Sequence, residues 1–269
     1  MTQAGVEWEA WRCGTAHSPT GLFLALLLPG SAAVVMVPDP DERSIDRDDA
    51  QRVIRAGLSH LQPRGLHYAQ GLVEPHALAQ AALLEEVGFR HLAPLAYLER
   101  SASYPWVDPP RDSEAEWVPY GPATHARFAD MVQATYEDSL DCPELAGLRP
   151  IHDVLAAHKA SGLFDPDLWE LAQIDGEPAA CLLLSRLVQV PALEVVYMGV
   201  IPSWRGRGVG GLLLRRGLQR CRERKAGRLT LVVDDRNGPA KALYNRLGFE
   251  PVTHRDAWLY RWPAGTSGS

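Results

Sequence analysis

The sequence lacks any apolar run long enough to cross a membrane. Its clearest candidate, Leu22–Leu28, has seven residues and is closed by Pro29 and Gly30, whereas a membrane-spanning helix needs about 20. The four cysteines lie far apart and fit neither a disulfide framework nor a closely spaced metal site, and the nine histidines show no ligand spacing. We therefore expect a cytoplasmic protein that holds no metal and does not bind a membrane.

The charge balance argues against a protein that coats nucleic acid, because 27 basic and 33 acidic side chains leave a formal net charge of -6. The charge is unevenly distributed, with a net -7 over residues 1–120 and a net +1 over residues 121–269. Residues 205–228 nevertheless hold nine Lys or Arg side chains and a single acid, Glu223. We interpret this basic stretch as a solvated helix face near a polyanionic cofactor.

A length of 269 residues predicts two domains. Residues 101–122 contain five prolines and few periodic apolar positions, which is typical of an extended linker. We expect a first domain over residues 1–105, a linker over 106–117, a second domain over 118–263 and a flexible tail over 264–269.

Residues 118–263 predict a mixed α/β domain with both hairpin and crossover connections. Asp175-Gly176 is a plausible hairpin turn and Gly248 a helix stop. The expected helices cover 125–139, 150–161, 209–225 and 239–247, and the expected strands cover 168–174, 179–190, 193–201, 229–233, 250–253 and 257–262.

The first hundred residues predict a similar order without the two leading helices. The expected strands are 6–11, 22–28, 32–37, 66–69 and 91–98, and the expected helices are 50–61 and 77–87. Residues 82–89 match residues 242–249, and residues 34–38 match 197–202, at offsets of 160 to 164 residues. Matches in the same order at nearly the same offset indicate a tandem repeat.

A glycine-rich basic loop connects a strand to a helix of the second domain. Arg205-Gly206-Arg207-Gly208-Val209-Gly210 is followed by Gly211. The glycines let backbone amides crowd together at the positive end of the helix dipole, and the two arginines add charged donors. This pattern favours a pyrophosphate site over a tight turn with exposed arginines.

With this loop and a later motif, the sequence resembles the GNAT superfamily of N-acetyltransferases. The family's phosphate signature is met by Arg205, Gly206, Arg207, Gly208, Val209 and Gly210. The second motif is met by Asn237, Ala240, Tyr244, Gly248 and Phe249. The resemblance covers residues 118–262 and only the later half of the fold in residues 1–105. It implies a tandem acyl-CoA N-acyltransferase fold of α/β class, with a central mixed β-sheet flanked by helices.

The resemblance implies acetyl-CoA as cosubstrate and direct transfer of acetyl to a primary amine. The loop would hold the pyrophosphate, the strand backbone at Met198, Gly199 and Val200 would bind the pantetheine, and Asn237 and Ala240 would contact the cofactor. A deprotonated amine and a proton for the departing thiolate are both needed. Glu194, at the start of an apolar strand, would be the base, although a strand-edge charge is the alternative. Tyr244 would serve the thiolate, unless it is only a packed aromatic side chain.

The acceptor is left open by the sequence. In this family the first two helices and their connection form one wall of the acceptor site, which here points to Tyr136, Asp138 and Asp141 as substrate-binding residues for a small-molecule or peptide amine. Some two-copy members act on an aminoglycosyl-cysteine, although the shortened first copy disfavours that acceptor here. The protein would be a monomer or a homodimer.

Two rival functions use the same residues differently. A non-catalytic acyl-CoA-binding sensor or interaction module would need only the phosphate loop, whereas Glu194 and Tyr244 favour an enzyme. An aminoacyl-tRNA-dependent transferase is disfavoured because it has no need of the CoA loop.

The first copy is predicted to be degenerate. Residues 38–49 contain no glycine and carry six or more acids at the place of the phosphate loop, which would repel a pyrophosphate. Leu84 stands opposite Tyr244 and Gly30 roughly opposite Glu194. We expect this copy to serve a structural purpose.

Overall fold

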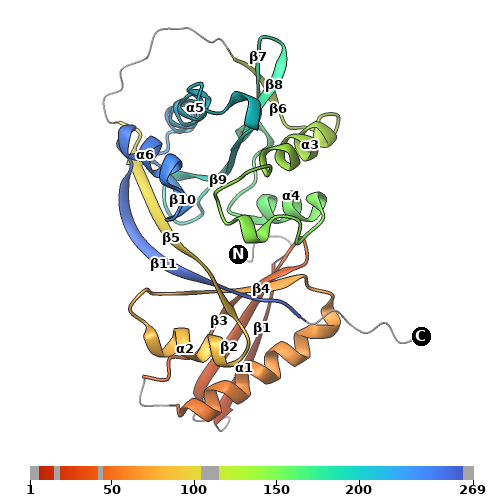
Figure 1. The fold of residues 1–269 in the computed structure, drawn as a ribbon, viewed down its shortest axis with the longest axis vertical. Coiled ribbons are helices and arrows are strands. Elements are labelled where there is room, and N and C mark those ends of the chain that lie inside the picture. Colours follow the sequence, from red (N-terminus) through yellow and green to blue (C-terminus); the bar gives the residue numbers. More distant parts are fainter. Residues whose placement is uncertain (1–5, 15–18, 42–44, 104–114, 263–269) are drawn as a thin grey trace, which may run out of the picture. The chain divides into compact units, whose positions relative to one another are not determined.

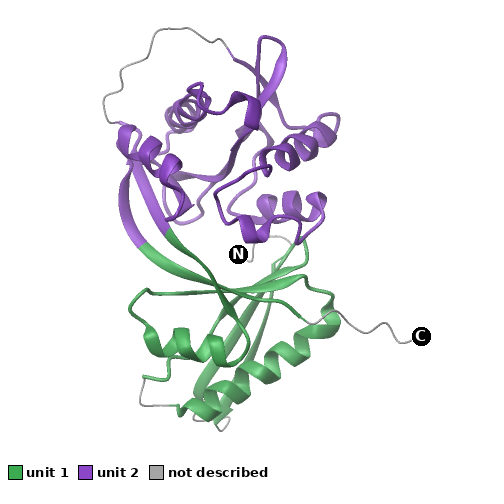
Figure 2. Cartoon of the chain, viewed as in Figure 1, with its two compact units in different colours: residues 1–95, 254–269 green, residues 96–253 purple. Residues whose placement is uncertain are grey.

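The computed structural model describes residues 6–14, 19–41, 45–103 and 115–262, and Figure 1 shows its elements. The chain forms two compact units, residues 1–95 with 254–269 and residues 96–253 (Figure 2). These bounds differ from the domains expected from the sequence, because the ends of two long strands lie in the other unit's range. Most of the expected linker, and the whole tail, fall outside the described residues.

The first unit is a mixed sheet with two helices. Its strands are β1 (Glu7–Gly14), β2 (Pro19–Leu28), β3 (Ala32–Met36), β4 (Tyr68–Val73) and the start of β5 (Arg90–Ser101), and its helices are α1 (Arg47–Leu61) and α2 (Leu78–Glu86). β1, β2 and β3 pair antiparallel, and β4 follows parallel to β3. α1 begins with a capping Asp46 whose carboxylate accepts from Asp49 N, so part of the acidic segment stabilises a helix start.

The second unit contains a similar sheet with more helices. Its strands are β6 (Glu116–Pro119), β7 (Trp169–Ile174), β8 (Glu177–Arg186), β9 (Ala192–Val200) and β10 (Arg228–Asp234), and its helices are α3 (His125–Thr135), α4 (Ile151–Ala160), α5 (Val209–Glu223) and α6 (Gly238–Arg246). β6 to β9 pair antiparallel in sequence order, and β10 is parallel to β9. Short 3-10 turns cover Gln62–Arg64, Pro143–Leu145, Pro166–Leu168 and Pro202–Trp204.

The two units share one connectivity, which agrees with the repeat seen in the sequence. Three antiparallel strands, a helix, a parallel strand and a second helix occur as β1-β2-β3-α1-β4-α2 and as β7-β8-β9-α5-β10-α6. α3 and α4 precede this series in the second unit and have no counterpart in the described part of the first.

Two apolar cores form on opposite faces of the second unit's sheet. α5 packs on one face through Leu213, Leu214 and Leu218 against strand residues such as Leu182 and Leu231. α3 and α4 cover the other face, where Phe128, Val132 and Leu155 contact Trp169 and Leu183 (Figure 1). The first unit has a separate core that includes Phe23, Ile54, Leu61, Leu83 and Phe89.

Several element boundaries differ from those expected. The two final strands are a single strand, β11 (Glu250–Tyr260), whose residues Asp256–Tyr260 pair with β4. Its polar middle has partners in the first unit: Arg255 pairs with Glu74, and Asp256 with His91. β6 was missed because it has four residues, ends in a proline and lies at the sheet edge. By contrast, the predicted turn is present, with Asp175 and Gly176 both at positive φ.

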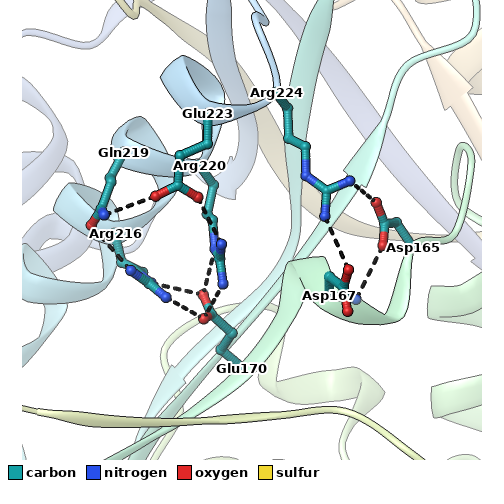
Figure 3. A network of polar contacts seen from close by, with 8 residues as sticks. All are labelled: Asp165, Asp167, Glu170, Arg216, Gln219, Arg220, Glu223 and Arg224. Atoms are coloured by element: carbon teal, nitrogen blue, oxygen red, sulfur yellow. Dashed lines mark hydrogen bonds and ion pairs between the residues drawn. The ribbon is translucent and has the colours of Figure 1, made fainter.

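The basic residues of α5 are paired, which corrects their interpretation as a solvated face (Figure 3). Glu170 on β7 is 2% exposed and accepts bidentate hydrogen bonds from Arg216 and Arg220 at 2.6 to 3.2 Å. Arg224 pairs with Asp165 and Asp167. These ion pairs hold α5 against the sheet and thereby fix the direction of its N-terminus.

No helix among the described residues is long and apolar enough to span a membrane.

Candidate active site

The second unit contains a cavity of about 410 Å³ beside the end of β9. Its walls come from the end of α3 and the segment after it, from β9 and from the start of α6. The lining residues are Thr135, Tyr136, Asp138, Ser139, Leu140, Asp141, Tyr197, Met198, Gly199, Val200, Arg205, Asn237, Pro239, Ala240 and Tyr244.

Ten of the residues singled out from the sequence line this cavity: Tyr136, Asp138, Asp141, Met198, Gly199, Val200, Arg205, Asn237, Ala240 and Tyr244. Glu194, Gly206, Arg207, Gly208, Val209 and Gly210 are not among its lining residues. The sequence analysis missed Thr135, Ser139, Leu140, Tyr197 and Pro239. Family motifs carry no signal for the first four, while Pro239 lies inside the second motif.

The glycine-rich loop leads from β9 into α5. Gly206 and Gly208 have positive φ values of 74° and 81°, and Gly208 is the N-cap of the 15-residue helix. An added Cβ at either glycine would meet no atom within 4 Å, so the backbone of the loop is open. Its amides lie at the positive end of a helix, an arrangement that suits an anion. The guanidinium of Arg207 lies over the Trp204 ring, 5.0 Å from its centroid.

Arg205 points away from the role expected for it. Its guanidinium donates to four main-chain carbonyls: Val200 O at 3.0 Å, Thr135 O and Asp138 O at 3.1 Å, and Glu137 O at 2.6 Å. All of its nitrogens are thus engaged by the protein itself. The motif position is where the sequence places it, but the contacts of its side chain are with a segment about 70 residues away.

Tyr244 lies on α6 with its ring packed against Phe249, and the residue is 8% exposed. Burial, and secondarily the charge of Asp141, raise the pKa of its phenol, which is therefore protonated at neutral pH. Asn237 caps α6, since its side-chain oxygen accepts from Ala240 N at 3.2 Å. The cap fixes the start of the helix that carries the tyrosine.

A β-bulge in β9 changes which face its residues present. Leu183 pairs with Tyr197 but Leu184 pairs with Val195, so Val196 is the extra residue. Tyr197 then packs on the α3 and α4 face. Its hydroxyl contacts Thr135 Oγ1 at 2.7 Å.

His158 of α4 stacks on the Tyr197 ring. Burial and the charge of Arg149 lower the pKa of His158 to about 4, so its imidazole is neutral. Tyr197 is thus held on two sides by uncharged groups.

Glu194 precedes the bulge, opposite Ser185 on β8. Leu193 and Val195 face the α5 core, and because strand residues alternate, Glu194 lies on the α3 and α4 face. Burial raises the pKa of its half-buried carboxyl, and no described residue forms a hydrogen bond or ion pair with it. Ser185 is also buried and has no hydrogen-bond partner among the described residues. Buried polar groups without partners mark places where a ligand is expected.

The segment after α3 forms the acidic wall of the cavity. Asp141 accepts from Asp234 N at 2.9 Å, and Asp234 accepts from Cys142 N at 3.2 Å. Burial, together with the charge of Asp234, raises the pKa of Asp141. Burial and the neighbouring acids raise the pKa of Cys142 to about 12, which makes its thiol a poor nucleophile.

Comparison with known proteins agrees with this fold. The model of the Acetyltransferase (GNAT) family matches residues 132–249. A mycothiol acetyltransferase of Thermobifida fusca is 30% identical over 244 residues, which cover 82% of this chain and 72% of the relative. A mycothiol acetyltransferase of Beutenbergia cavernae is 41% identical over 92 residues, 33% of this chain and 30% of the relative.

Solved structures share the fold at low identity. A GCN5-related N-acetyltransferase from Sphaerobacter thermophilus aligns with a TM-score of 0.63 and 18% identity, covering 93% of this chain and 80% of that one. A tandem GNAT protein from the clavulanic acid biosynthesis pathway aligns with a TM-score of 0.57 and 13% identity, covering 98% and 86%.

The fold, the glycine loop at the start of α5 and the cavity beside β9 together define an acyltransferase. More particularly, the chain belongs to the GNAT family of acetyltransferases.

Proposed function

We propose that the second unit transfers acetyl from acetyl-CoA to the primary amine of a small molecule. The observation that carries this proposal is the single cavity in which the β9 backbone, Tyr244 and the acidic segment after α3 meet. It lies beside an open glycine loop whose amides suit a pyrophosphate.

The residues present fit acetyl-CoA. The amides of Gly206 to Gly210 would hold the pyrophosphate, and the exposed Arg207 would supply positive charge. The backbone of Met198, Gly199 and Val200 lines the cavity and would bind the pantetheine. Asn237 and Ala240, at the start of α6, would complete the site.

Glu194 and Tyr244 divide the proton transfers in this proposal. Glu194 would accept a proton from the acceptor ammonium, directly or through water, and its raised pKa suits a base that must take up a proton near neutral pH. The amine nitrogen then bonds to the thioester carbonyl carbon and the carbon–sulfur bond breaks. Tyr244, held protonated by burial, would give its proton to the departing thiolate.

The acidic segment after α3 supports a cationic acceptor. Tyr136, Asp138 and Asp141 line the cavity, and a carboxylate wall attracts an ammonium group. Since relatives named mycothiol acetyltransferases align with the chain, one of them over 82% of its length, we propose an aminoglycosyl-cysteine amine as the acceptor.

The first unit would be a degenerate copy with a structural purpose. Leu84 takes the place of Tyr244 on the equivalent helix and is fully buried. Gly30, roughly opposite Glu194, carries no side chain. The acidic segment in place of the phosphate loop lies partly outside the described residues. The four cysteines are free, which agrees with a reducing cytoplasm.

The experiment that tests this function is a panel of amines assayed for amine-dependent release of CoA from acetyl-CoA. The panel holds a glucosaminyl-cysteine conjugate, glucosamine, cysteine methyl ester and a lysyl peptide, with mass spectrometry of the acetylated product. We expect the conjugate to give the highest kcat/KM. If CoA binds but no amine is acetylated, the protein is the non-catalytic acyl-CoA sensor, and the enzymatic proposal fails.

A further inference from the structure

Arg205 is the point where the glycine loop meets the segment that follows α3. Its Nε donates to Val200 O at the end of β9, while its two terminal nitrogens donate to Thr135 O, Glu137 O and Asp138 O. One side chain therefore fastens the end of a helix and the next three residues to the strand that lines the cavity.

The chemistry of this contact requires an arginine. Thr135 ends α3, and the last carbonyls of a helix have no partner within the helix. A cation is favoured there by the helix dipole. The planar guanidinium presents five N–H donors in a fixed fork, so it reaches several carbonyls at once, whereas a lysine ammonium is a compact point charge on a flexible stem.

A second fastening holds the other end of the same segment. Asp234 on β10 exchanges hydrogen bonds with Asp141 and Cys142, and Arg236 pairs with Glu144 at 2.9 Å. Asp138 and Cys142, next to the two fastenings, have positive φ values of 51° and 44°, a region that residues with a side chain seldom adopt. Ser139, Leu140 and Asp141 lie between them and line the cavity.

We propose that Arg205 is a positioning residue that shapes the acceptor wall of the cavity, residues 138–141, and is not a ligand of the cofactor phosphates. The proposal rests on the function proposed above, because it assigns this wall to the amine. Arg207, whose guanidinium contacts only a tryptophan ring among the described contacts, then remains as the arginine of the loop that is available to phosphate.

The test compares Arg205→Ala, Arg205→Lys and Arg207→Ala, with Arg127→Ala as a control that removes an exposed arginine from α3. Calorimetry with CoA measures the Kd of the cofactor, hydrogen–deuterium exchange follows residues 136–142, and kinetics with the glucosaminyl-cysteine conjugate gives its KM. For Arg205→Ala we expect faster exchange in residues 136–142, a KM raised about tenfold or more, and a CoA Kd within about twofold of wild type.

Arg205→Lys separates the two roles, because it keeps the charge and loses the fork. We expect it to exchange as fast as Arg205→Ala and to leave CoA binding unchanged. Arg207→Ala should weaken CoA binding and leave the exchange of residues 136–142 at the wild-type rate.

The proposal is overturned if Arg205→Ala weakens CoA binding as much as Arg207→Ala does and Arg205→Lys restores it, or if exchange in residues 136–142 does not change. Failure of the proposed function gives a different result, since wild type would then bind no CoA or acetylate no amine, while the exchange data would still report on Arg205.

Discussion

Gly199→Ala is expected to separate α3 from β9 and to disturb the cavity between them. A Cβ at this position would lie 2.5 Å from Thr135 Oγ1, 2.6 Å from its Cβ and 2.8 Å from its Cγ2. Thr135 cannot yield easily, because it is 3% exposed, its hydroxyl donates to Val132 O, and it also contacts Tyr197 Oη.

The magnitude follows from these contacts. Overpacking of a dense core costs about 1 to 3 kcal/mol, and replacing glycine returns about 0.4 to 1 kcal/mol through the unfolded chain. A net loss of about 1 to 2 kcal/mol lowers the Tm of a unit of this size by about 2 to 8 °C. Since Gly199 lies in the segment proposed to bind pantetheine, CoA affinity should fall as well.

Thermal unfolding and CoA calorimetry measure both effects. Gly121→Ala is the matched control, because its Cβ would meet only Thr124 Oγ1, at 4.0 Å, and lies outside the cavity. Adding Thr135→Gly to Gly199→Ala removes all three clashing atoms and should recover CoA affinity. A Gly199→Ala variant with the wild-type Tm and Kd would refute the packing argument.

Four further changes test the site and the helix that supports it. Glu194→Gln should lower kcat by about 10² to 10⁴; in wild type, kcat/KM should fall as the pH drops through the raised pKa of Glu194, because a protonated carboxyl accepts no proton, and the variant should lose this inflection. Tyr244→Phe should lower kcat about 10²-fold with little change in the KM of acetyl-CoA; an unchanged kcat would leave Tyr244 as packing only. Gly208→Ala places a side chain at a φ of 81°, which costs about 1 to 3 kcal/mol, so calorimetry should show weaker CoA binding. Glu170→Ala leaves two partly buried arginines without their carboxylate, which costs about 3 to 5 kcal/mol and should lower the Tm by about 6 °C or more; a smaller shift would mean that the network contributes little.

The order of elements in the second unit was readable because its signals are local. Gly248 ends α6, Asp175-Gly176 forms the predicted turn, and the glycine loop opens α5, each through the backbone preferences of a few neighbouring residues. The same holds for the cavity residues that lie in two short motifs, such as Asn237 and Tyr244.

Features that depend on distant partners were not readable. Glu170 has no marker in the sequence that pairs it with Arg216 and Arg220, 46 and 50 residues later, so the basic stretch looked solvated. The polar triplet at residues 254–256 suggested a break between two strands, but its side chains find partners in the first unit.

The β9 bulge illustrates the same limit within a single strand. Strict alternation would place Tyr197 on the face opposite Met198's neighbours, and nothing in the run from Glu194 to Val200 marks Val196 as the extra residue. Likewise, the four carbonyl acceptors of Arg205 come from segments that only the fold brings together.

The most direct test of the central claim is a crystal structure of the protein with CoA. The account predicts the pyrophosphate on the amides of Gly206 to Gly210, the pantetheine along Met198 to Val200 and the sulfur within hydrogen-bonding distance of the Tyr244 hydroxyl. CoA bound elsewhere, or bound with its sulfur remote from Tyr244, would contradict it.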